Sequence, residues 1–137
     1  MTGILLVTHA NLGSTLIETV EFILGKSSDN LTFVSINIQE DPGSLRKKIK
    51  KGISTVKMDN GVIILTDMFG GTPSNLSYSF LEEGQVEVIS GVNLPILLKA
   101  VTARTKMDME TLTLSLVEHG KRSISLASGI LKGTKRT

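Results

Sequence analysis

The chain has 137 residues, a formal net charge of +2 and no cysteine. This length suits one domain with its own hydrophobic core, and the lack of cysteine excludes disulfides and thiolate metal sites. The small charge and the 4% aromatic content argue against a nucleic-acid-binding surface. No apolar run approaches the roughly 20 residues of a membrane span, and no basic leader precedes the first one. We therefore expect a cytoplasmic globular protein.

The first predicted unit is a strand followed by a helix. Residues 4–7 form a continuous apolar run, which is typical of a strand buried on both faces of a parallel sheet. The run stops before His9, so that this side chain is expected at the carboxyl end of the strand. A helix over 12–24 follows, with Asn11 as its N-cap and Gly25 as its end.

The second and third strands enclose a basic helix. Partial alternation over 31–38 predicts an edge strand, and Pro42 opens a helix with an apolar face. Its other face carries Arg46, Lys47, Lys48, Lys50 and Lys51, either as a solvated surface or as a docking surface for an acidic partner. The apolar run 62–65 predicts a third strand, and Asp67 follows just beyond its end.

The residues after Asp67 predict a tight turn into a helix. Gly70 and Gly71 allow the backbone to turn close to a ligand. Thr72 is expected to act as the N-cap of a helix that begins at Pro73 and runs to about residue 81. The exposed amides of such a helix start attract anions.

The remaining sequence predicts a strand over 86–90, a helix after the motif at 91–95, and a helix capped by Asp108 and ending near Gly120. Alternation over 123–127 predicts a final strand. These units predict one α/β domain over 1–128 and a basic tail over 129–137. Its open, doubly wound and mostly parallel sheet is expected to have helices on both faces and the strand order 2-1-3-4.

Two side chains are expected to meet where such a sheet binds ligands. Ligands bind beyond the carboxyl ends of parallel strands, at the point where the strand order reverses. His9 ends the first strand there and Asp67 follows the third. A carboxylate that accepts the proton of one imidazole nitrogen leaves the other nitrogen free to attack phosphorus. The pair therefore predicts phosphoryl transfer through a histidine.

The groups expected to hold the phosphoryl group come from the two flanking loops. Amides of Gly70, Gly71 and Thr72 are preorganised donors, and the hydroxyls of Thr8 and Thr72 add further ones. No metal or cofactor is expected, because two histidines on separate elements make a poor metal site. Phosphate-binding and dinucleotide-binding glycine motifs are absent as well.

A structural role remains an alternative for each of these residues. A single histidine at a strand end is usually structural, and Asp67 alone is explained by capping a turn. The convergence of both with the Gly-Gly-Thr-Pro sequence favours catalysis. His119 stands at a predicted helix end, where its charge interacts favourably with the helix dipole, and we assign it no functional role.

Three motifs carry a resemblance to a known family. They are Val-Thr-His at 7–9, Thr-Asp-Met-Phe-Gly-Gly-Thr-Pro-Ser-Asn at 66–75 and Gly-Val-Asn-Leu-Pro at 91–95. With these motifs, about the first 127 residues resemble the mannose-family enzyme IIA domain of the bacterial phosphoenolpyruvate-dependent sugar phosphotransferase system. Phe69 departs from the pattern, since a tryptophan is common at this position.

The resemblance implies a phosphotransferase that accepts a phosphoryl group from the carrier protein HPr on His9 and passes it to an enzyme IIB domain for sugar uptake. It implies that Asp67 binds Nδ1 of His9, so that Nε2 is phosphorylated beside Thr72. It also implies a homodimer in which residues 123–127 form an antiparallel strand in the partner's sheet. No IIB sequence follows here, so a separate acceptor protein is expected, and membrane contact only through transporter subunits.

Two alternatives to sugar uptake stay open. One is a regulatory protein whose phosphorylation state controls a binding partner. The other is a phosphotransfer subunit serving dihydroxyacetone kinase, which shares the fold and an equivalent histidine but is disfavoured by the Gly-Gly-Thr-Pro-Ser-Asn block.

Overall fold

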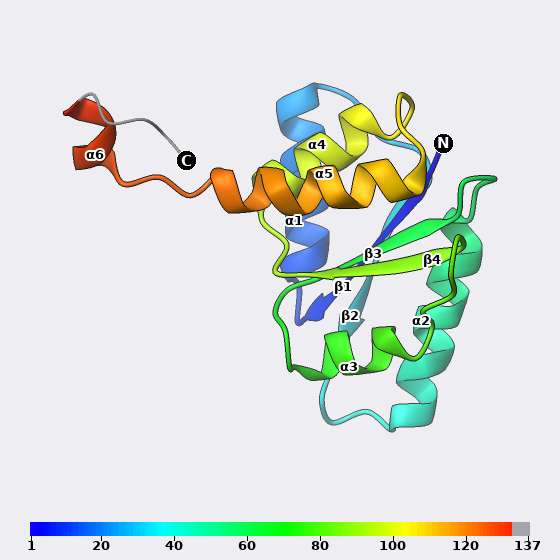
Figure 1. Ribbon diagram of the computed structural model, residues 1–137. Coiled ribbons are helices and arrows are strands. Elements are labelled where there is room, and N and C mark those ends of the chain that lie inside the picture. Colours follow the sequence, from blue (N-terminus) through cyan, green and yellow to red (C-terminus); the bar gives the residue numbers. More distant parts are fainter. Residues whose placement is uncertain (133–137) are drawn as a thin grey trace.

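The computed structural model describes residues 1–132 and contains one parallel sheet flanked by helices (Figure 1). The strands are β1 (Gly3–His9), β2 (Leu31–Ile36), β3 (Val62–Thr66) and β4 (Val86–Ser90). The helices are α1 (Leu12–Leu24), α2 (Pro42–Val56), α3 (Thr72–Tyr78), α4 (Leu94–Ala103), α5 (Met109–Arg122) and α6 (Ala127–Leu131). The strand order is β2-β1-β3-β4, which confirms the predicted order 2-1-3-4.

Alternation along the strands divides the core into two layers. Ile4 and Leu6 of β1 point to the face covered by α1, α4 and α5, whereas Leu5 and Val7 point to the face covered by α2 and α3 (Figure 1). All four side chains are fully buried. Continuous apolar runs therefore formed the central strands, as expected for strands covered on both faces.

Several predicted helix ends are confirmed. Gly25 ends α1 in the left-handed conformation, with a φ of 71°, and its N–H donates to the carbonyl of Glu21. The Asp108 side chain caps α5 by accepting a 2.8 Å hydrogen bond from the N–H of Thr111. Pro42 begins α2 as predicted.

Of two further predicted N-caps, one is confirmed in position and the other is displaced by one residue. Asn11 occupies the N-cap position of α1, but its side chain makes no capping bond; the Thr8 hydroxyl accepts from the N–H of Gly13 instead. The backbone is already helical at Thr72, so that Gly71 is the N-cap of α3 and Thr72 is its first residue. Helix α3 also ends at Tyr78, three residues earlier than expected.

The predicted strand over 123–127 is not formed within the described residues. Residues 124–126 are extended without a partner strand, and Ala127 begins α6, which stands apart from the sheet and the other helices (Figure 1). A strand needs a neighbour for its backbone hydrogen bonds, and within residues 1–132 none lies beside this segment. Of the predicted tail over 129–137, residues 133–137 lie outside the description. None of the described helices combines the length and hydropathy of a membrane span.

Candidate active site

The topology brings His9 and the loop after β3 together at one end of the sheet. His9 is the last residue of β1, and β1 lies between β2 and β3. The connection after β1 crosses to β2 on one side, while β3 lies on the other, so His9 stands where the strand order reverses. The chain leaves β1 through Ala10, whose φ of 48° lies in the left-handed region that is uncommon for alanine. This unusual turn immediately follows the candidate nucleophile.

One carboxylate oxygen of Asp67 holds His9 in two ways. Oδ2 accepts a 2.9 Å hydrogen bond from the backbone N–H of His9 and lies 2.8 Å from its Nδ1. A carboxylate facing Nδ1 favours the tautomer that carries its proton on Nδ1. The Asp67 side chain is 11% exposed and that of His9 is 38% exposed. The geometry therefore leaves Nε2 with a free lone pair on an accessible ring.

The environment of Asp67 favours its charged form. Burial by itself raises the pKa of this carboxyl group. Hydrogen bonds from the His9 backbone and imidazole, together with the charge of His9, lower the pKa by more than burial raises it. The net result is a pKa below the ordinary value. The other oxygen, Oδ1, accepts a 3.1 Å hydrogen bond from the N–H of Met68. Asp67 is thus an ionised acceptor at neutral pH.

Gly71 brings the loop after β3 against the imidazole ring. A Cβ atom added to Gly71 would lie 2.9 Å from Cε1 of His9 and 3.5 Å from Nε2. The first distance is shorter than real Cβ contacts, so only glycine permits this approach. Gly70 supports the same turn with a φ of 84°. The predicted close approach of this backbone to the site is present.

The loop presents backbone donors without protein acceptors. In residues 1–132, the N–H groups of Gly70, Gly71 and Thr72 form no hydrogen bond, and neither does the Thr72 hydroxyl. Thr72 is half-buried at the start of α3, next to Gly71. These donors lie in the segment that contacts the accessible edge of His9. They suit an anion held at Nε2.

Thr8 is placed differently from the other candidates. Its side chain is fully buried, and Oγ1 accepts from the N–H of Gly13 and lies 3.3 Å from the carbonyl oxygen of His9. Both partners belong to the chain, which leaves the hydroxyl committed to the turn between β1 and α1. The structure therefore favours support of the His9 backbone over direct contact with a ligand.

A cluster of four hydroxyl groups behind the loop was not foreseen from the sequence. It joins β3, β4 and α3 and consists of Thr66, Ser74, Ser90 and Tyr78. Each residue type is common in strands, helices and turns, so no local sequence signal marks it. A weak indication was that Thr66 and Ser90 are polar residues that end two adjacent strands in paired positions.

A surface hollow of about 560 Å³ opens beside His9. Its lining includes Asn37, Ile38, Glu40 and Lys48, and the last two form a 2.6 Å ion pair. The hollow lies at the carboxyl ends of β1 and β2, the expected location for a ligand. A partner or a small molecule can reach His9 from this side.

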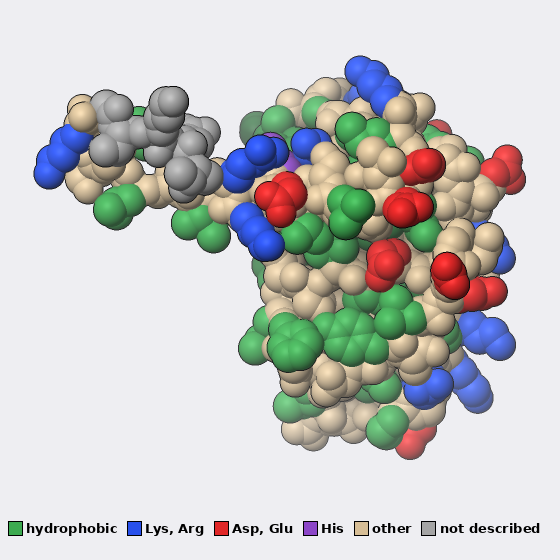
Figure 2. All heavy atoms as spheres, in the orientation of Figure 1, with side chains coloured by type: hydrophobic (Ala, Val, Ile, Leu, Met, Phe, Trp, Pro, Cys, Tyr) green, Lys and Arg blue, Asp and Glu red, His purple; other side chains and the backbone are tan. Residues whose placement is uncertain are grey.

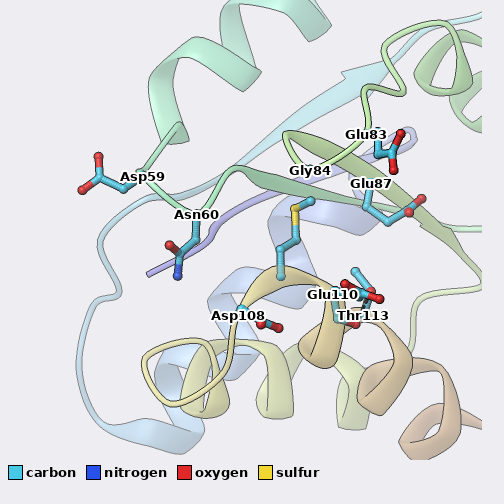
Figure 3. Close-up of a pocket in the computed structure, with 9 residues that line it drawn as sticks. Asp59, Asn60, Glu83, Gly84, Glu87, Asp108, Glu110 and Thr113 are labelled. Atoms are coloured by element: carbon cyan, nitrogen blue, oxygen red, sulfur yellow. Dashed lines mark hydrogen bonds between the residues drawn. The ribbon is translucent and has the colours of Figure 1, made fainter.

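A second hollow, of about 610 Å³, lies at the opposite end of the sheet, near the starts of β3, β4 and α5 (Figure 3). Its lining includes five acidic residues, Asp59, Glu83, Glu87, Asp108 and Glu110. Acidic side chains also gather over this face in the space-filling view (Figure 2). No three His, Cys, Asp or Glu side chains of the described chain are arranged to hold a metal ion. The carboxylate-oriented imidazole makes the slightly smaller hollow at His9 the candidate site.

His119 belongs to neither hollow. It lies in the last turn of α5, where burial and the charges of Lys99 and Arg122 lower its pKa. The lowered pKa argues against the favourable helix-dipole charge that the sequence suggested. His119 therefore has no part in the candidate site.

A parallel sheet in the order 2-1-3-4, with a carboxylate-oriented histidine at its switch point, defines a doubly wound α/β protein equipped for nucleophilic chemistry. Residues 3–117 match the family model described as the PTS system fructose IIA component, and the chain belongs to this family. It is an EIIA component of the mannose, fructose and sorbose class of the sugar phosphotransferase system.

Relatives of known name agree with this assignment. The fructose-specific EIIA component of Bacillus subtilis (strain 168) is 29% identical over 98% of this chain and 92% of its own length. The sorbose-specific EIIA component of Lacticaseibacillus casei is 32% identical over 84% of this chain and 83% of its own length. The crystal structure of the PTS IIA protein associated with the fucose utilization operon of Streptococcus pneumoniae superposes with a TM-score of 0.82, at 26% identity, over 95% of this chain and 96% of that one.

Proposed function

We propose that the chain relays a phosphoryl group through Nε2 of His9, taking it from phosphorylated HPr and giving it to a separate enzyme IIB protein. The observation that carries this proposal is the 2.8 Å contact between His9 Nδ1 and Asp67 Oδ2. It commits Nδ1 to the carboxylate and leaves Nε2 accessible beside Gly71. Membership in the EIIA family supports the same donor and acceptor.

The proposed phosphoryl transfer needs only the donor histidine, His9 and Asp67, because one bond to phosphorus forms as another breaks. The Nε2 lone pair attacks the phosphorus of the donor phosphohistidine, and the bond between phosphorus and the donor nitrogen breaks with its electron pair returning to that nitrogen. The Nδ1 proton stays between the ring and Asp67, whose negative charge offsets the positive charge that develops on the imidazole. Transfer to IIB repeats these events with His9 as the donor.

The loop from Gly70 to Thr72 is proposed to hold the phosphoryl oxygens. Its free amides and the Thr72 hydroxyl are preorganised, so they stabilise the charge of the transferring group without rearrangement. The mostly buried carboxylate of Asp67 lies close to the same place and repels a dianion. The free donors are needed to offset this repulsion once His9 is phosphorylated.

We also propose that two chains assemble by strand exchange. In the described residues β4 is an edge strand, and the extended segment after α5 exposes Ile124 and Leu126, at 76% and 75%. A hollow of about 220 Å³ between β4 and α5 is lined in part by Ile89, Ser90 and Ile124. Pairing of residues 123–126 with β4 of the partner would satisfy both backbones.

The direct test is incubation with phosphoenolpyruvate, enzyme I and HPr. We expect an acid-labile, alkali-stable phosphate that appears on the wild-type chain and on His119→Ala but not on His9→Ala. Label retained on His9→Ala would overturn the assignment of His9. Adding a IIB protein should then discharge the wild-type phosphate; partners that bind only one phosphorylation state, with no transfer to IIB, would favour the regulatory alternative.

A further inference from the structure

The hydroxyl cluster is connected to the candidate nucleophile through the backbone of a single residue, Met68. Ser74 Oγ donates a 2.5 Å hydrogen bond to the carbonyl oxygen of Met68, and the N–H of Met68 donates to Oδ1 of Asp67. The Met68 backbone is therefore held at both ends. Because Oδ2 of the same carboxylate holds His9, a path that alternates between hydrogen bonds and covalent links leads from Ser74 through Met68 and Asp67 to the imidazole.

The direction of the hydrogen bonds within the cluster follows from counting protons. The carbonyl of Met68 offers no proton, so the single Ser74 proton is committed to it. Thr66 Oγ1 donates its proton to Ser90 Oγ at 2.9 Å, so Ser74 Oγ accepts from Ser90 Oγ, also at 2.9 Å. Ser90 Oγ in turn lies 2.7 Å from the hydroxyl of Tyr78. The resulting chain from Tyr78 through Ser90 and Ser74 points toward Met68, and aligned hydrogen bonds of this kind strengthen one another.

Burial makes this chain a rigid one. Thr66 and Ser74 are fully buried, while Ser90 and Tyr78 are half-buried. The cluster also spans three elements, since Thr66 and Ser90 end adjacent strands and the other two side chains come from α3. The loop that carries Asp67 is thereby fixed to both the sheet and the helix. None of the four side chains makes a hydrogen bond with His9 itself.

We propose that Ser74 is a positioning residue for phosphoryl transfer, acting through the Met68 backbone to hold Asp67 against Nδ1 of His9. This inference rests on the proposed function of His9, but the geometry that it describes exists without any phosphoryl donor. Ser90 and Tyr78 act in series behind Ser74. Loss of the Ser74 hydroxyl frees the Met68 carbonyl, and the carboxylate then samples orientations that no longer fix the imidazole.

Helix α3 contains a matched control. Ser77 is also fully buried, but its hydroxyl has no hydrogen-bond partner in the described residues. Ser74→Ala and Ser77→Ala therefore remove the same atom from the same helix, with and without a connection to Asp67. A general effect of deleting a buried hydroxyl will appear in both variants. An effect through Met68 will appear only in Ser74→Ala.

The experiment compares the full-length wild type with these two variants by NMR of ¹⁵N-labelled histidine, without any donor. We expect the Nδ1 proton of His9 to exchange faster with solvent, and the ring nitrogen shifts to move toward averaged tautomers, in Ser74→Ala alone. With phosphorylated HPr, the maximal rate should fall about tenfold or more in Ser74→Ala, since a misplacement of about 1 Å costs on the order of 100-fold. KM for HPr should change by less than about twofold, because the docking surface is untouched.

Identical NMR signatures in Ser74→Ala and Ser77→Ala would overturn the positioning role, whether or not His9 is phosphorylated in the wild type. Absence of wild-type phosphorylation would instead count against the proposed function alone. If Ser74→Ala does not fold, Ser74→Cys gives the same decision, because a thiol fills the place of the hydroxyl but donates only weakly. An unchanged Nδ1 proton in folded Ser74→Cys would then refute the proposal.

Discussion

Asp67 contacts the backbone and the side chain of His9 with the same oxygen atom, at 2.9 Å from the backbone nitrogen and 2.8 Å from Nδ1. The backbone bond fixes where the carboxylate stands relative to β1, and the imidazole bond fixes the ring relative to the carboxylate. A single oxygen atom thus fixes the position of the loop after β3 relative to the end of β1. Position and tautomer of the candidate nucleophile have a common cause.

Replacing this carboxylate by an amide should separate geometry from charge. Asp67→Asn can keep an oxygen near Nδ1 but loses the negative charge that offsets the developing imidazolium. We expect His9 phosphorylation to slow by roughly 100-fold to 10⁴-fold, the upper figure being the loss when the orienting carboxylate of a catalytic-triad histidine becomes an amide. Rates of label transfer from HPr measure this. An Asp67→Asn chain that is phosphorylated at the wild-type rate would contradict the role given to the charge.

Stability should depend on pH through the same group. The pKa of Asp67 in the folded chain lies below its ordinary value, so its ionised form stabilises the fold. This contribution is fully present above the pKa of the unfolded chain, about 3.9 for aspartate, and is lost as the pH falls through the lower folded pKa. Urea unfolding at a series of pH values should show wild type and Asp67→Asn converging in stability as the pH falls. A constant difference down to the most acid point would contradict this linkage.

Gly71→Ala should damage the site more than the fold. The new methyl group would lie 2.9 Å from Cε1 of His9, so either the ring or the loop must move. We expect loss of most phosphoryl acceptance, because a displacement of about 1 Å costs on the order of 100-fold. Histidine NMR shifts report the displaced ring and thermal unfolding reports the fold. Wild-type shifts at His9 would show that the contact is not as tight as the structure has it.

Arg104 offers a stability prediction remote from the chemistry. It is 4% exposed and its guanidinium donates to the carbonyls of Asp29, at 2.5 Å, and Asn30, at 3.0 Å. Arg104→Met fills similar space but leaves these carbonyls without their donor, so we expect the free energy of unfolding to fall by about 3 kcal/mol. Urea denaturation measures the loss. Phosphorylation of the folded variant should match wild type at low temperature.

The extended segment after α5 provides a test of assembly. If Ile124 and Leu126 are buried on a partner's sheet, Ile124→Lys should prevent dimer formation, since an unpaired buried charge is unfavourable. Light scattering at several concentrations distinguishes monomer from dimer. Leu131→Lys is a useful comparison, because Leu131 is 86% exposed but lies beyond the proposed strand. A monomeric wild type, or a dimeric Ile124→Lys, would count against strand exchange.

The sequence by itself determined the central strands, most helix ends and the main site pair. Continuous apolar runs identified β1 and β3 because burial on both faces requires them, and the reversal of strand order placed His9 and Asp67 at one end. The helix-capping roles of Gly25 and Asp108 could be predicted because helix ends depend on local backbone chemistry. The glycine pair after Asp67 was likewise a local signal of a tight turn.

Only the tertiary structure decided which groups support that pair. The Thr8 hydroxyl was expected near the phosphate, but its burial commits it to Gly13, while Ser74 reaches the site indirectly through Met68. Such bonds join positions from different elements, and the short-range patterns of a sequence do not specify them. The segment over 123–127 shows the same limit, since its alternation requires a neighbouring strand that residues 1–132 do not supply. Local order follows from nearby residues, whereas hydrogen-bond partners depend on the packed fold.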